Sequence, residues 1–128
     1  MLYADTSALT KLVLSERESE AFRAYVIDRE RLVSSVLVIT ELVRATHRVR
    51  PDLDEEARAI LADLTLLNLD RAILDAAGTL PPPQIRTLDA IHIASALTLG
   101  GELEALVTYD ARMAEAARAA RLRVEAPE

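Results

Sequence analysis

Residues 2–9 read LYADTSAL, a short apolar run that ends at an acidic residue and continues into small polar residues. We interpret residues 2–5 as a buried strand that runs directly into a helix, because Thr6 and Ser7 are both competent helix caps. This arrangement places Asp5 at the end of the strand. A carboxylate among aliphatic residues is costly to bury unless a positive charge neutralises it.

Three further acidic residues have similar surroundings: Glu41 in VITELVR, Asp89 in RTLDAIHIASAL and Asp110 in ALVTYDAR. Taken singly, Asp5 and Asp110 have an ordinary interpretation as helix caps, and Asp89 as an acid favoured at a helix N-terminus. Four together suggest a shared cation. Because the chain contains no cysteine and only two histidines, that cation would be a hard, oxygen-liking ion such as Mg²⁺ or Mn²⁺.

The remaining elements follow from hydrophobic periodicity and from turn residues. Strands are predicted at residues 2–5, 32–35, 64–69, 103–109 and 122–125, and helices from Thr6 or Ser7 onward and at residues 16–30, 36–48, 54–63, 71–78, 87–99 and 111–120. This alternation predicts an α/β/α sandwich with a central, mainly parallel sheet. Such folds bind ligands outside the carboxyl ends of their strands. We expect all four acids at that edge, with Glu41 about two turns into its helix and Asp89 in the first turn.

Composition limits the classes of protein that the chain can represent. We expect a single domain over residues 1–128. No segment resembles a signal peptide or a membrane span, so the expected location is the cytoplasm. The net charge of −6 argues against a protein that coats nucleic acid in general, but not against an enzyme that acts on it. The chain lacks G-x-G-x-x-G, P-loop and G-x-S-x-G motifs, so dinucleotide binding, NTP hydrolysis and α/β-hydrolase chemistry have no support.

Polar residues near the four acids are candidates for supporting roles. Ser7 and Thr108 each lie two residues from an acid, where a hydroxyl can hold a carboxylate or a metal-bound water, or simply cap the backbone. The candidate phosphate contacts, for which ordinary surface charge is the alternative, are Arg44, Arg48, Arg86 and Lys11.

The two histidines receive different interpretations. His92 lies one turn past Asp89 on an otherwise apolar helix, and we interpret it as a hydrogen-bonded core histidine rather than as a ligand or base. His47 is expected at the surface.

Four segments resemble the PIN domain, and specifically the VapC-type toxin ribonucleases of bacterial toxin–antitoxin pairs. They occur in order over nearly the whole chain and read YADTSALTKL, SSVLVITEL, RTLDAIHIASAL and LVTYDARMAEAARAARLRV. The resemblance implies a PIN fold, Mg²⁺- or Mn²⁺-dependent endoribonuclease activity, a homodimer, and inhibition by a small VapB-type antitoxin. It equates Asp5, Glu41, Asp89 and Asp110 with the family's acidic quartet. Asp5 and Asp89 are the first-choice direct metal ligands, and Asp110 and Glu41 would bind directly or through water.

Two other classes of protein remain open. A receiver-type, metal-binding signalling domain would have an acidic pair after its first strand and a lysine late in the chain, whereas Asp5 stands alone and Lys11 is the only lysine. A PIN-fold protein that binds RNA or a partner without cleavage is the second alternative. For a short helix of the antitoxin, the apolar surface of the two amino-terminal helices, which includes Phe22 and Tyr25, is a candidate groove wall, with core or dimer surface as equal alternatives.

Overall fold

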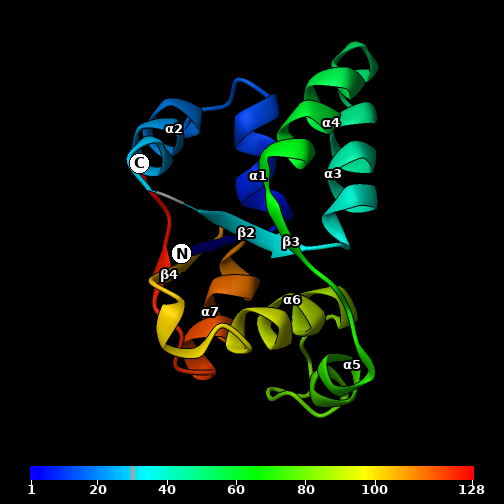
Figure 1. Ribbon diagram of the computed structural model, residues 1–128, viewed down its shortest axis with the longest axis vertical. Coiled ribbons are helices and arrows are strands. Elements are labelled where there is room, and N and C mark those ends of the chain that lie inside the picture. The colour runs from blue at the N-terminus through cyan, green and yellow to red at the C-terminus, as the bar shows by residue number, and fades with distance from the viewer. Residues whose placement is uncertain (30) are drawn as a thin grey trace.

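A parallel sheet forms the centre of the molecule. The computed structural model describes residues 1–29 and 31–128, and in them the strands run in the order β3-β2-β1-β4-β5, all parallel (Figure 1). Their bounds are β1 (Leu2–Ala4), β2 (Leu32–Ser35), β3 (Thr65–Leu67), β4 (Ala105–Val107) and β5 (Val124–Glu125). Receiver domains share the doubly wound order 2-1-3-4-5. The receiver-type alternative is therefore wrong.

Helices cover both faces of the sheet. Figure 1 shows α1 to α4 on one side and α5 to α7 on the other. Their bounds are α1 (Thr6–Val13), α2 (Ser19–Ile27), α3 (Val38–His47), α4 (Asp54–Asp63), α5 (Arg71–Gly78), α6 (Thr87–Leu97) and α7 (Ala111–Ala119), and the short 3₁₀ helices are η1 (Pro51–Leu53) and η2 (Gly100–Glu102). The predicted α/β/α sandwich is confirmed.

The alternation of side chains along β1 explains the two layers. Leu2 and Ala4 belong to the core under α1 to α4, whereas Tyr3 belongs to the opposite core, where it packs with Ile93 of α6 and Met113 of α7. Both sets are fully buried, as a parallel sheet covered on both faces requires. The central strand thus joins the two cores through consecutive residues.

Most predicted elements are present, several of them shorter than expected. The ranges 32–35, 54–63 and 71–78 match β2, α4 and α5. The strand predicted at residues 103–109 is trimmed to Ala105–Val107, because Leu103 caps η2 at one end and the Tyr109 N–H bonds to the Ser7 hydroxyl at the other. The helix predicted at 16–30 spans Ser19–Ile27, and its predicted end at Glu30 lies outside the described residues.

One expectation about a side-chain position is corrected, and one that the sequence left open is decided. The Ser35 hydroxyl accepts a hydrogen bond from the Leu37 N–H, and the resulting turn delays α3, so that Glu41 lies in its first turn rather than its second. Phe22 is fully buried and packs edge-on against Tyr109, with ring centroids 6.1 Å apart. It is therefore a core residue and forms no groove wall. Among the described residues, no helix has the length and apolar character that crossing a membrane requires.

Candidate active site

All four predicted acidic residues line one pocket of about 550 Å³, which we call the acidic pocket. Its lining includes Asp5 and Asp110, which follow the adjacent strands β1 and β4. The helices that begin there, α1 and α7, cover opposite faces of the sheet (Figure 1). The divergence of two such helices opens a crevice at the strand ends. The structure therefore brings together Asp5, Glu41, Asp89 and Asp110 from four different parts of the chain.

Asp5 is the most buried of the four acids, with an exposed fraction of 5%. It is the N-cap of α1, where Oδ1 accepts hydrogen bonds from the Ala8 N–H at 3.0 Å and the Ser7 hydroxyl at 2.7 Å. Its Oδ2 accepts a hydrogen bond of 2.5 Å from the Thr108 hydroxyl. Burial outweighs these bonds and raises the pKa of Asp5 above its ordinary value.

The two hydroxyl residues also tie the first helix to the loop after β4. Strand register pairs Ala4 with Val107, so Asp5 and Thr108 follow as neighbours. Ser7 Oγ accepts the Tyr109 N–H at 2.9 Å, and Thr108 Oγ1 accepts the Asp110 N–H at 3.1 Å. Ser7 and Thr108 thus both hold a carboxylate and accept backbone N–H groups, two of the three roles that the sequence left open.

A single guanidinium joins two of the remaining acids. Arg86 donates from Nε to Asp89 at 2.9 Å and from Nη2 to Asp110 at 2.8 Å. Asp110 also caps α7 by accepting the N–H groups of Arg112 and Met113. Burial alone would raise the pKa of Asp110, but the Met113 and Arg86 hydrogen bonds prevail and lower it. Arg86, a predicted phosphate contact, is here the counter-ion of the pocket.

Glu41 is held by a histidine. His92 Nε2 lies 2.7 Å from Glu41 Oε1, and the other ring nitrogen, Nδ1, lies 2.7 Å from the Tyr3 hydroxyl. His92 is only 2% exposed, yet it lines the acidic pocket. The core histidine expected from the sequence is therefore also part of the pocket wall. Tyr3 is a member of this group that the sequence analysis missed, because nothing in the local pattern links it to a residue 89 positions away.

The four carboxylates are not arranged as a ready metal cluster. Within residues 1–29 and 31–128, no three acidic or histidine side chains meet closely enough to hold an ion. The Arg86 guanidinium lies between Asp89 and Asp110, so an ion bound by both would replace it there. The donor set, carboxylate oxygens without sulfur, fits a hard cation such as Mg²⁺ or Mn²⁺.

The other predicted basic contacts fall into two groups. Arg48 lines the acidic pocket, and it also lines an adjoining pocket of about 820 Å³ with Arg44 and Glu41. Arg58 of α4 lines that second pocket too, and the sequence analysis missed it because only the packing of α4 on α3 brings it there. Lys11 instead pairs with Glu18 at 2.8 Å and Glu16 at 3.0 Å and does not line the acidic pocket.

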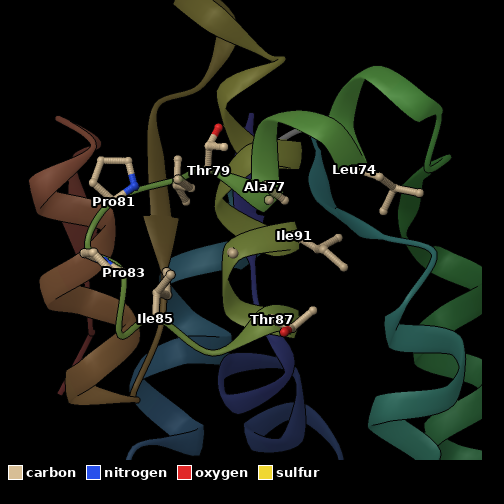
Figure 2. Close-up of a pocket in the computed structure, with 11 residues that line it drawn as sticks. Leu74, Ala77, Thr79, Pro81, Pro83, Ile85, Thr87 and Ile91 are labelled. Atoms are coloured by element: carbon tan, nitrogen blue, oxygen red, sulfur yellow. The ribbon is translucent and has the colours of Figure 1, made fainter.

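A further pocket, of about 610 Å³, lies between α5, α6 and the segment that contains three consecutive prolines, residues 81–83 (Figure 2). Figure 2 shows its lining, which includes Leu74, Ile85 and Ile91 and has no charged side chain. It offers no group for acid–base or metal chemistry.

Comparison with known proteins agrees with this geometry. Residues 2–119 match the PIN domain family. The chain is 44% identical over 126 residues to Ribonuclease VapC46 of Mycobacterium tuberculosis. The aligned residues cover 98% of this chain and 97% of that protein. It is also 44% identical over 131 residues to Ribonuclease VapC35 of the same organism, with coverages of 99% and 97%.

Two solved structures share the fold at 15% sequence identity. One is VapC20 of Mycobacterium tuberculosis, described as a toxin that cleaves the sarcin–ricin loop, with a TM-score of 0.79 over 99% of this chain and 100% of that chain. The other is VapBC2 of Rickettsia felis bound to a DNA fragment from its promoter, with a TM-score of 0.72 over 100% of both chains. The chain therefore belongs to the PIN domain family and, within it, to the VapC-type ribonucleases.

The raised pKa of Asp5 predicts how stability depends on pH. As pH rises above the ordinary value of 3.8, the unfolded chain ionises Asp5 first, so wild type loses stability until the folded pKa is passed. The amide that replaces this carboxyl in the Asp5→Asn variant does not titrate. We expect this variant to be more stable than wild type near neutral pH in EDTA, with the difference disappearing at low pH. Urea unfolding of both chains across pH measures this, and a difference independent of pH would contradict the assignment.

Proposed function

We propose that the acidic pocket is the active site of a metal-dependent endoribonuclease, and that the chain is the toxin of a VapBC-type toxin–antitoxin pair in the cytoplasm. The observation that carries the proposal is the convergence of four carboxylates on one pocket at the carboxyl edge of the sheet. The names of the relatives, all ribonucleases of the VapC type, support RNA as the substrate.

The four acidic residues of the pocket would have different roles in binding a cation. Asp89 and Asp110 face each other closely enough to share one guanidinium, and they would share an Mg²⁺ or Mn²⁺ ion in the same way. Asp5, a first-choice direct ligand from the sequence, has both oxygens engaged in hydrogen bonds, so Asp110 takes its place in the pair, and Asp5 and Glu41 would bind directly or through water. When bound, such an ion supplies an activated water and stabilises the charge that develops on the departing oxygen. A protein nucleophile is then unnecessary.

Arginines beside the acidic pocket would hold the RNA backbone. Arg48 and Arg44 of α3, with Arg58 of α4, line the pocket that adjoins the carboxylates, and no ion pair is found for them among the described residues. A guanidinium binds a phosphate through two parallel hydrogen bonds. Displaced by a metal ion, Arg86 would become a further phosphate contact at the rim.

The two hydrogen bonds that Arg86 donates also indicate how a partner would inhibit the site. A guanidinium fits between Asp89 and Asp110, so an arginine from a VapB-type antitoxin would compete with the ion at the same two carboxylates. The VapBC2 neighbour supports an antitoxin of this type. A homodimer, which the family resemblance implies, is part of the proposal. The alternative, a PIN-fold protein that binds RNA or a partner without cleavage, would have the same pocket and would differ only in that it does not hydrolyse RNA.

The first prediction concerns the metal. We expect the purified chain to cleave RNA with Mg²⁺ or Mn²⁺ and to lose this activity in excess EDTA. Asp89→Asn should reduce the cleavage rate roughly 100-fold or more, because metal charge stabilisation is worth several kcal/mol and each 1.4 kcal/mol is a factor of about ten. Asp75→Asn is the matched control, since Asp75 pairs with Arg71 outside the acidic pocket. Undiminished cleavage in EDTA, or by Asp89→Asn, would refute the site, and no cleavage under any condition would favour the non-cleaving alternative.

The second prediction concerns the phosphate contacts. Arg48→Gln should weaken RNA binding and flatten the dependence of log K on log salt by about 0.7, the value for one contact to a single strand. Arg44→Gln should act in the same direction. Arg123→Gln removes the same charge from a residue paired with Glu125 and should leave the salt slope unchanged. Fluorescence anisotropy over a series of salt concentrations measures these slopes. If all variants have the same slope, Arg48 contributes only ordinary surface charge and does not contact a phosphate.

The third prediction concerns the partners. Expression of the chain alone should arrest growth, and co-expression of the small protein encoded beside it should restore growth. Asp5→Asn should be harmless in both settings, because it lacks one carboxylate of the site. Light scattering of the purified Asp5→Asn chain should give the mass of a dimer. Harmless expression of a chain that cleaves RNA in vitro would argue against the toxin role, and a monomer mass against the homodimer.

A further inference from the structure

A chain of short hydrogen bonds runs from the core of the protein to the acidic pocket. It begins at the Tyr3 hydroxyl, passes through both nitrogens of the His92 ring and ends at Glu41 Oε1, with each contact at 2.7 Å. Tyr3 has an exposed fraction of 0% and His92 of 2%. The two rings also meet edge-on, with centroids 5.9 Å apart and planes at 77°. The imidazole is therefore enclosed by protein and open only at its Glu41 end.

The chemistry of the partners determines where the imidazole hydrogen lies. Glu41 as a carboxylate only accepts hydrogen bonds, so a bare Nε2 facing it at 2.7 Å would set two lone pairs against each other. Nε2 must therefore carry a hydrogen, whether the ring is neutral or cationic. In the neutral ring, Nδ1 is then an acceptor, and the Tyr3 hydroxyl is the donor that it faces.

This arrangement engages Oε1 of Glu41 and leaves the second carboxylate oxygen available to a ligand in the acidic pocket. One oxygen is bound by the Nε2–H, and Glu41 has no other side-chain partner among the described residues. Glutamate has three rotatable bonds, so without this contact its carboxylate would sample many positions. Partners of this kind fix the orientation of metal-binding groups, and their loss typically lowers metal affinity 10–100-fold.

We propose that His92 is a positioning residue that holds the Glu41 carboxylate in the acidic pocket, and that Tyr3 fixes the orientation of the His92 ring. The inference rests on the proposed function, because it assigns Glu41 a place among the groups that bind the ion. It extends the site from the four acids to a buried residue of β1 and to the histidine of α6.

The test measures metal binding without RNA and without turnover. Mn²⁺ titration calorimetry of folded protein should show about 10–100-fold weaker binding for His92→Leu than for wild type. His92→Gln, whose amide nitrogen can take the place of Nε2, should recover much of the loss. Tyr3→Phe removes only the hydroxyl and should give a smaller loss. Thr46→Val is the control: it removes a buried hydroxyl from α3, the helix of Glu41, but one that bonds only to the backbone of that helix. It should change stability and leave Mn²⁺ affinity unchanged.

Nitrogen NMR of the two histidines gives a readout that a purely structural role would not change. In wild type, the His92 signals should show a hydrogen on Nε2. Glu41→Gln should shift the Nε2 signal, and Tyr3→Phe the Nδ1 signal. A hydrogen on Nδ1 alone would overturn the inference, and so would His92→Leu protein that is folded and binds Mn²⁺ as wild type does. Wild-type protein that binds no Mn²⁺ while its Nε2 is protonated would instead overturn the proposed function, and the positioning role with it.

Discussion

The site depends on one constraint, which is the burial of a carboxylate at the end of the central strand. Asp5 follows β1 directly, and its backbone and side chain begin α1. The same side chain is bound by Thr108, which belongs to the segment that leads from β4 into α7. One carboxylate therefore fixes the relative positions of two adjacent strands and of the helices that leave them. The shape of the pocket follows from that connection.

Residues of the chain itself hold the remaining carboxylates of the pocket. Arg86 joins Asp89 and Asp110 and offsets part of their charge, and His92 lies within hydrogen-bond distance of Glu41. Crowded carboxylates repel one another, so the protein without an ion needs such internal partners to keep the pocket formed. The two partners differ in their exposure, because the Arg86 side chain is 55% exposed and that of His92 only 2%. A side chain at the surface can move aside for a cation, whereas an enclosed ring remains in place. Under the proposed function, Arg86 would be a replaceable counter-ion and His92 a fixed support of Glu41.

The sequence predicts the framework of the site better than its contacts. The order of strands and helices places Asp5, Glu41 and Asp110 at one edge of the sheet, because parallel strands share their carboxyl ends. The turn at Ser35 that shortens the start of α3 is a local hydrogen bond that periodicity does not reveal. The ion pairs of Arg86 depend on a side-chain conformation, and the contact between Tyr3 and His92 joins residues 89 positions apart. Phe22 lies in the core, which is one of the positions that the sequence left open, because an amphipathic pattern does not show which neighbours will cover its apolar face.

The topology of the sheet explains how residues from four segments reach one pocket. In the order β3-β2-β1-β4-β5, the strand that carries Asp5 lies in the middle, with strand neighbours on both sides. Groups can therefore approach its end from α3 on one side and from the β4–α7 segment on the other, and α6 contributes Asp89 and His92 from the second helix layer. Four acids from four segments surround a pocket in a way that one loop could not achieve. The separation of the contributing segments also explains why each acid, taken alone, has the ordinary features of a helix cap or of a residue in a first helical turn.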